Sequence, residues 1–114
     1  MLLRIWRTGV KRERLKEYEE FERSYSLPMF ERQEGCLGVF FLRGGDVCAA
    51  LSLWRSETDV VALDSSPTYQ QTVARLIASG LLEGEQSIEI FECAQGAIER
   101  GLLDLVGIWR LPPG

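Results

Sequence analysis

The chain contains no histidine, and this absence removes several kinds of active site at once. A serine–histidine–aspartate triad needs an imidazole as its general base, and many zinc and haem sites need one as a metal ligand. The three cysteines, Cys36, Cys48 and Cys93, lie far apart along the chain. Without histidine they are not typical of a metal site, so we expect no bound metal. Their odd number predicts reduced thiols that pack as small apolar side chains.

Basic side chains are too few and too dispersed for a nucleic-acid site. Lysine and arginine total 13 against 17 aspartates and glutamates, a formal net charge of −4, whereas nucleic-acid binding needs a basic face. Long apolar runs are absent too. None approaches the roughly 18 residues of a membrane-spanning helix, and the N-terminus lacks the apolar region of a signal peptide. We therefore expect a cytoplasmic protein that has no nucleic-acid or membrane partner.

The sequence does contain an ordered alternation of strand and helix patterns. Apolar and polar residues alternate over residues 2–8 and 84–93, helical spacing covers residues 11–32 and about 57–79, and two apolar runs, 35–43 and 46–55, flank a glycine pair. Such a pair is typical of a two-residue hairpin turn. The resulting order predicts a ferredoxin-like βαββαβ domain of the α+β class over residues 1–95. Its four-stranded antiparallel sheet is expected to carry both helices on one face.

Local signals predict where the helices begin and where the first one is disturbed. Ser56 is expected to cap one helix, and Ser66 to cap the next, with Pro67 at its first helical position. Gly80 is the expected stop. Pro28 is expected to interrupt the first helix, because proline lacks an N–H group and clashes with the preceding turn.

The predicted hairpin is apolar on both faces, which is unusual for a sheet that helices cover on one side only. A turn at Gly44-Gly45 places Phe41 opposite Cys48. Leu37, Val39 and Phe41 then share one face, and six apolar residues share the other: Phe40, Leu42, Val47, Ala49, Leu51 and Leu53. Monomers rarely expose so large an apolar face. We therefore expect two copies to pair face to face as a homodimer. The alternative is that the apolar tail, residues 96–114, covers this face; the tail is expected to dock on its own subunit or on the partner.

Six segments form an ordered set, although none is specific by itself. They are Leu27-Pro28, residues 35–38, the hairpin at Gly44-Gly45, residues 51–56 around Trp54, residues 65–69 and residues 84–92. The set resembles the antibiotic biosynthesis monooxygenase family over residues 1–95. This resemblance implies a dimeric α/β barrel with a pocket in each subunit between helices and sheet. Characterised members include oxygenases of aromatic polyketides that use neither metal nor flavin, haem-degrading enzymes, and enzymes that act on small signalling molecules. The resemblance therefore implies no cofactor.

The haem-degrading members of the family use an asparagine, a tryptophan and a histidine. This sequence has neither histidine nor asparagine, so only the tryptophan carries over, onto Trp54, and we do not expect haem degradation. The polyketide oxygenases place an amide near their tryptophan, and that group is missing here as well.

A pocket around Trp54 is the predicted site. Trp54 ends the third strand, and small residues on its side of the sheet leave room for a flat aromatic ligand. We assign catalytic roles to Trp54 and Tyr69, with a simple core position as the alternative for both. The predicted substrate-binding residues are Trp6, Tyr25, Phe30, Gly35, Ala50, Ser52 and Arg43, with Arg4 or Arg7 as other possible holders of an anionic oxygen. Glu22 is the best candidate for a general base.

The leading functional hypothesis is a cofactor-independent monooxygenase that acts on a small aromatic or quinone-forming substrate. Without a cofactor, the substrate must reduce O₂ itself as an enolate or phenolate, and the protein must stabilise that anion. Two alternatives stay open. One is a non-catalytic dimeric module that binds a small molecule or regulates, and the other is an isomerase or lyase that acts on a small metabolite.

Overall fold

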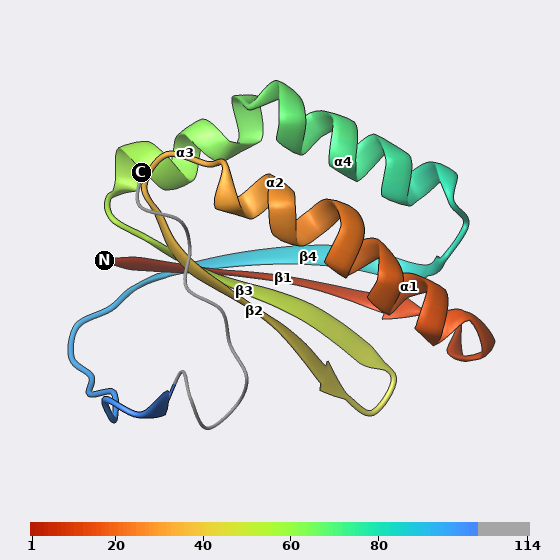
Figure 1. Ribbon diagram of the computed structural model, residues 1–114, viewed down its shortest axis with the longest axis horizontal. Helices are drawn as coiled ribbons and strands as arrows, with labels where there is room; N and C mark the ends of the chain where they lie inside the picture. The colour runs from red at the N-terminus through yellow and green to blue at the C-terminus, as the bar shows by residue number, and fades with distance from the viewer. Residues whose placement is uncertain (103–114) are drawn as a thin grey trace.

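The computed structural model describes residues 1–102 and has the predicted α+β architecture. Four antiparallel strands form one sheet in the order β2-β3-β1-β4, and the helices lie together on one face of it (Figure 1). The strands are β1 (Leu2–Val10), β2 (Cys36–Gly44), β3 (Val47–Trp54) and β4 (Leu82–Glu92). The helices are α1 (Leu15–Phe21), α2 (Leu27–Glu31), α3 (Glu57–Ser65) and α4 (Pro67–Ala78). The ferredoxin-like prediction is confirmed.

The first α-helix is interrupted just before Pro28, as predicted, but the chain keeps a helical conformation through the interruption. A π-helical turn, Glu22–Ser26, joins α1 to α2, and Pro28 lies in the first turn of α2. Ser26 has helical backbone angles and its side chain makes no capping hydrogen bond. The wider turn absorbs the strain that proline introduces into a regular helix, so the chain stays helical. The extra residue also rotates the side chains about the helix axis, so that Ser26 is buried and Tyr25 is exposed.

The hairpin is formed as predicted, but its register differs by two residues. Phe41 pairs with Ala50 and Gly44 with Val47, so the two loop residues are Gly45 and Asp46. Gly45 has a φ of +59°, the conformation that such a turn needs and that glycine adopts without strain. Because side chains alternate with a period of two, a shift of two keeps every side chain on its predicted face.

The two predicted serine caps are confirmed. The Ser56 hydroxyl accepts a hydrogen bond from the backbone N–H of Asp59 at 3.3 Å, and the Ser66 hydroxyl accepts one from the N–H of Tyr69 at 3.4 Å. Pro67 follows Ser66 at the start of α4. These caps fix where α3 and α4 begin, and therefore which face of α4 meets the sheet.

Two apolar clusters fill most of the space between helices and sheet. One includes Phe21, Cys48 and Leu76 under the α1 end, and the other is built around Trp54 near α3. Cys36, Cys48 and Cys93 are all free thiols. The candidate site lies between these two clusters.

The opposite face of the sheet carries apolar side chains, as predicted. Leu42, Val47 and Phe91 lie on it and are 43%, 46% and 50% exposed. Residues 93–102 leave the end of β4 and run on this side of the sheet (Figure 1). Most of the tail whose docking was predicted, residues 103–114, lies outside the described residues. No helix within residues 1–102 is long and apolar enough to cross a bilayer. A cytoplasmic location stays a prediction.

Candidate functional site

A cavity of about 40 Å³ lies between the sheet and the helices α2 and α4. Its floor comes from β1, β2 and β3, and its roof from the first helix and from α4. The lining residues are Arg4, Trp6, Tyr18, Ser26, Met29, Phe30, Phe41, Ala50, Tyr69, Thr72, Val73 and Leu76. Most of these side chains are apolar. The few polar groups therefore decide what chemistry the cavity supports.

Arg4 and Tyr69 form a hydrogen-bonded pair in the wall, which also carries the hydroxyl-bearing residues Tyr18, Ser26 and Thr72. Arg4 is 2% exposed, and its Nη2 donates a hydrogen bond to the Tyr69 hydroxyl at 2.8 Å. The guanidinium carbon also lies 5.3 Å from the centre of the Tyr69 ring. The tyrosine oxygen accepts from Arg4 and donates to no group within residues 1–102, which leaves its proton for a ligand. The pair is thus an oxygen-anion binder: a neutral donor backed by a buried cation.

Within residues 1–102 the charge of Arg4 is only weakly balanced. The carboxylate oxygen paired with it there is that of Asp64, 3.6 Å from Arg4 Nη2, and the Asp64 side chain is 66% exposed. An ion pair at that distance with a solvated partner contributes little. A buried guanidinium gains more from a closely bound anion, so the electrostatics of the wall favour an anionic ligand.

Trp54, the centre of the predicted site, does not line this cavity. Its side chain is 0% exposed and packs in a cluster with Met29, Phe30, Val60 and Leu63. The indole N–H donates to the Ser52 hydroxyl at 2.8 Å. Ser52 was expected to leave room beside Trp54, but its hydroxyl instead accepts the hydrogen bond of the indole N–H. The structure therefore places Trp54 and Ser52 in the core.

Gly35 also lies outside the cavity, for a different reason. It precedes β2 with a φ of +78°, and a Cβ atom there would lie 2.2 Å from the carboxyl group of Asp59. The backbone carbonyl of Gly35 accepts a hydrogen bond from the N–H of Arg55 at 2.9 Å. Glycine is therefore required for the loop to pass close to α3 and not for space beside a ligand.

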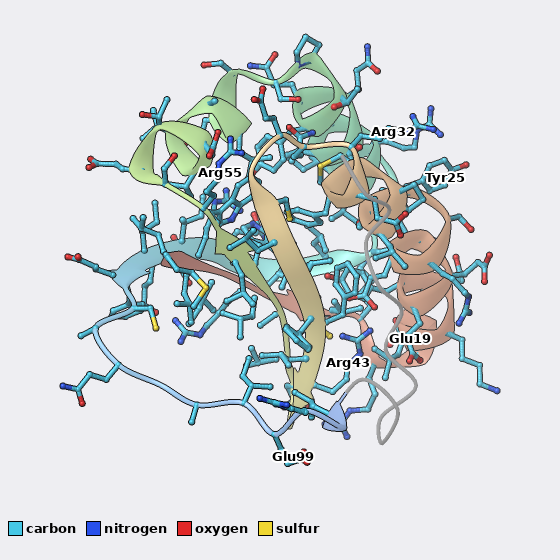
Figure 2. The ribbon with its side chains drawn as sticks, turned by 60° about the vertical axis from the view of Figure 1, so that its left-hand side comes forward. Glu19, Tyr25, Arg32, Arg43, Arg55 and Glu99 are labelled. Atoms are coloured by element: carbon cyan, nitrogen blue, oxygen red, sulfur yellow. The ribbon has the colours of Figure 1, made fainter. Side chains whose placement is uncertain are left out.

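Arg43 is held by the first helix and does not reach the cavity. Its guanidinium forms a two-armed ion pair with the carboxylate of Glu22, with one N–O distance of 3.2 Å, and its carbon lies 5.4 Å from the centre of the Tyr18 ring. Figure 2 shows Arg43 between β2 and the first helix. Burial raises the pKa of Glu22, and the bond to Arg43 offsets this only in part. Glu22 does not line the cavity, so it is not placed to act as a base there.

Tyr25 points outward from the first helix (Figure 2) and is 43% exposed. Its ring packs beside Phe21, with 5.0 Å between ring centres, and the Arg75 guanidinium carbon lies 4.4 Å from its centre. The π-helical turn explains this position, because the added residue gives the inward place to Ser26. Tyr25 thus joins the first helix to α4 on the outside of the molecule.

Of the nine residues predicted for the site, the structure brings four together around the cavity: Trp6, Phe30, Ala50 and Tyr69. Arg4 was one of three arginines considered for an anionic oxygen, and only it reaches the cavity. Arg7 is on the opposite face, paired with Glu89. The alternation of side chains along β1 could have selected Arg4 over Arg7, because Arg4 shares a face of the strand with Trp6. Thr72, Val73 and Leu76 were missed, although they follow Tyr69 at helical spacing.

Comparison with solved structures gives consistent neighbours at low sequence identity. SnoaB, a cofactor-independent oxygenase from Streptomyces nogalater, is 19% identical with a TM-score of 0.66, over 86% of this chain and 97% of that one. A candidate antibiotic biosynthesis monooxygenase from Caulobacter crescentus is 15% identical with a TM-score of 0.70, over 82% and 90%. The chain has the fold of the antibiotic biosynthesis monooxygenases.

This fold also occurs in proteins without a known role. A protein of unknown function from Nitrosomonas europaea is 21% identical with a TM-score of 0.70, over 88% of this chain and 95% of that one. No protein-family profile and no curated protein matches the chain in sequence. The likeness is thus one of monooxygenase-type fold, and the activity must be argued from the cavity.

Proposed function

We propose that the protein is a cofactor-independent oxygenase of small phenols or enols, and the observation that carries this is the Arg4–Tyr69 pair in the cavity wall. The pair supplies what such a reaction needs most, which is stabilisation of a substrate oxygen anion in a largely apolar space. The resemblance of the fold to a cofactor-independent oxygenase supports the same function.

In the proposed reaction the ligand supplies all the electrons. The bound enolate or phenolate transfers electron density from its ring or α-carbon to O₂, and a carbon–oxygen bond forms. The reacting carbon, a CH₂ group in the keto tautomer of the substrate and a ring C–H in the phenol itself, then becomes C=O as the O–O bond breaks. The second oxygen atom leaves as water with the two hydrogens lost by the substrate. The Tyr69 hydroxyl donates a hydrogen bond to the anionic oxygen of the substrate. Arg4 stabilises the negative charge that the substrate oxygen and the Tyr69 oxygen share.

A second candidate is a binding module without catalysis. Among the described residues, no carboxylate lines the cavity, and the buried Glu22 is engaged by Arg43. Deprotonation of a ligand would then fall to the solvent or to the ligand's own acidity. Burial also raises the pKa of Tyr18, which keeps that side chain protonated and unsuited to act as a base.

Oxygen uptake separates the two candidates. Uptake is measured with a single-ring hydroquinone and with anthrone, for the wild type, Tyr69→Phe and Tyr25→Phe. We expect the single-ring compound to be oxidised faster, because the cavity is small, and Tyr69→Phe to lower its kcat about a hundredfold. Tyr25→Phe is the matched control, since that hydroxyl lies outside the cavity. Tight binding without uptake above the protein-free rate would establish the binding module instead.

We further propose that the protein works as a dimer paired through the sheet face opposite the helices. The half-exposed Leu42, Val47 and Phe91 leave apolar side chains on that face, which a second copy would cover. Sedimentation should give a dimeric mass for the wild type, and Leu42→Asp should give a folded monomer, since a carboxylate would be buried in the interface. A monomeric wild-type mass at micromolar concentration contradicts the pairing.

A further inference from the structure

The cavity is smaller than the ligands considered above, and this mismatch indicates where the rest of a ligand would lie. A volume of about 40 Å³ corresponds to space for roughly three water molecules. Only the oxygen and the adjoining part of a ring fit beside Arg4 and Tyr69. The rest of the ligand must lie outside the cavity, along a wall that continues outward as an apolar surface.

The floor of the cavity continues onto β4. Arg4 pairs with Ile90 and Trp6 with Ile88 across the β1–β4 ladder. Directly paired residues of antiparallel strands share a face, with Cβ atoms about 5 Å apart. Ile88 and Ile90 therefore lie beside the two floor residues. They are 49% and 48% exposed, so the helices leave them largely uncovered. We call this pair the β4 shelf.

The shelf is apolar over a limited length. Its face also carries Gln86, which donates a hydrogen bond to the Thr8 hydroxyl at 3.1 Å, and at the other end Glu92, which pairs with Leu2. Glu89 lies on the opposite face of the sheet, where its carboxylate pairs with Arg7. Successive same-face residues are about 7 Å apart, so the shelf accommodates a substituent of a few carbons.

The helix α4 adds an exposed apolar side chain on the side away from the first helix. Arg75 packs on Tyr25 of the first helix. The side of α4 that carries Arg75 therefore faces the first helix. Ile77 follows two residues later, about 200° around the helix axis, and therefore projects away from the first helix. It is 62% exposed. Together with Val73 in the cavity wall, it gives the outward path an apolar upper edge.

We propose that the site takes an amphipathic ligand, a phenol or enol whose oxygen meets Tyr69 and Arg4 and whose apolar substituent lies on the β4 shelf. Charge complementarity fixes the direction: the buried Arg4 attracts the anionic end inward, while Glu92 at the end of the shelf repels it. The inference rests on the proposed oxygen site for the inner end of the ligand. The shelf adds the requirement for an apolar substituent.

The test separates the two ends of the ligand by binding affinity. Dissociation constants are measured by calorimetry for phenol and its 4-alkyl derivatives from methyl to hexyl. For the wild type we expect Kd to fall about twofold to fourfold for each of the first few carbons and then to level off. The double variant Ile88→Thr/Ile90→Thr keeps β-branched residues suited to a strand. It should abolish most of this gain per carbon and leave the Kd of phenol within about twofold.

Two further variants serve as controls. Tyr69→Phe should weaken every member of the series by the same factor and leave the gain per carbon unchanged. Val61→Thr, at a 59% exposed position on α3, should change neither. Should the double variant unfold, the single variants Ile88→Thr and Ile90→Thr are measured in the same way.

The possible failures are distinguishable. An unchanged gain per carbon in the folded β4 variants overturns the shelf. So does phenol binding by the wild type with no gain from added carbons, and this outcome leaves the proposed oxygen site intact. Absence of binding for every member, together with absence of oxygen uptake, overturns the proposed function and the shelf together.

Discussion

The space between sheet and helices is filled at one end and hollow at the other, although both ends present an aromatic side chain with a polar partner. At the filled end the Trp54 N–H donates to Ser52 at 2.8 Å, and the ring is completely buried. At the hollow end Arg4 donates to Tyr69 at the same distance, but the Tyr69 hydroxyl borders the cavity. The indole uses its one donor within the protein, whereas the tyrosine keeps a donor for a ligand.

This difference shows why an aromatic residue beside small ones does not by itself identify a pocket. Ala50 and Ser52 lie on the same face of β3, two residues apart. Ala50 lines the cavity, while the Ser52 hydroxyl accepts the hydrogen bond of the Trp54 N–H. Whether a small residue leaves space for a ligand depends on whether a neighbouring side chain fills that space. Stability should therefore depend on the filled end, and ligand binding on the hollow one.

The largest expected effect is at Trp54. Trp54→Ala removes a completely buried ring and should lower the free energy of unfolding by about 3–5 kcal/mol, measured by urea denaturation. Trp54→Phe should lower it less and leave the affinity for phenol unchanged. A loss of phenol affinity in a stable Trp54→Phe protein would show that the filled end takes part in binding.

The next effect concerns the partner of the indole. Ser52→Ala leaves the buried N–H of Trp54 without an acceptor and should cost about 1–3 kcal/mol of unfolding free energy. In a Trp54→Phe background the same substitution should cost much less, because no N–H remains to be satisfied. Equal costs in the two backgrounds, measured as a double-mutant cycle, would contradict the role assigned to this hydrogen bond.

Tyr69→Phe should have a smaller effect on stability, although its effect on a ligand is large. The cavity admits water, which can replace the lost acceptor for Arg4, so we expect a change of at most about 1 kcal/mol in thermal or urea denaturation. A destabilisation as large as that of Trp54→Ala would mean that the hollow end is part of the core.

The smallest effect is the pH dependence due to Glu22, beside the cavity. Burial raises its pKa, so the folded protein holds this proton more tightly than the unfolded chain does. The contribution of Glu22 to the free energy of unfolding is fully present below its pKa in the unfolded chain. It is lost as the pH rises through its pKa in the folded protein. Glu22→Gln removes the fall. Urea denaturation from about pH 4 to about pH 7 should therefore show wild-type stability declining relative to the variant. The opposite trend would show that Arg43 over-compensates burial.

The elements of the fold were predictable because their signals are local. Ser56 and Ser66 cap their helices, Pro67 begins α4, and Gly80, with a φ of +73°, ends it. Each of these preferences acts within a few residues. The hairpin was also found, but a glycine pair followed by aspartate allows two turn positions, and the structure adopts the later one at Gly45-Asp46.

The site was only partly predictable, because a cavity is what remains after all side chains are packed. Tyr69 and Trp6 were found as aromatics on inward faces, and the same alternation would have singled out Arg4 over Arg7. The positions of Trp54 and Arg43 depended on contacts with residues distant in sequence, Met29 and Glu22. Tyr25 was misplaced because a regular helical period was assumed through residues 22–26, where the turn is wider.

The π-helical turn has a consequence for how this sequence is aligned with others. One residue in the segment Glu22–Ser26 is surplus to a regular helix. The two halves of the helix are therefore out of phase, and a gap-free alignment to a protein with a regular helix would match inward residues to outward ones on one side of the turn. A one-residue gap within residues 22–26 brings Tyr18 and Phe30 into correspondence with inward positions together. Alignments built in that way will compare the two ends of the cavity roof correctly.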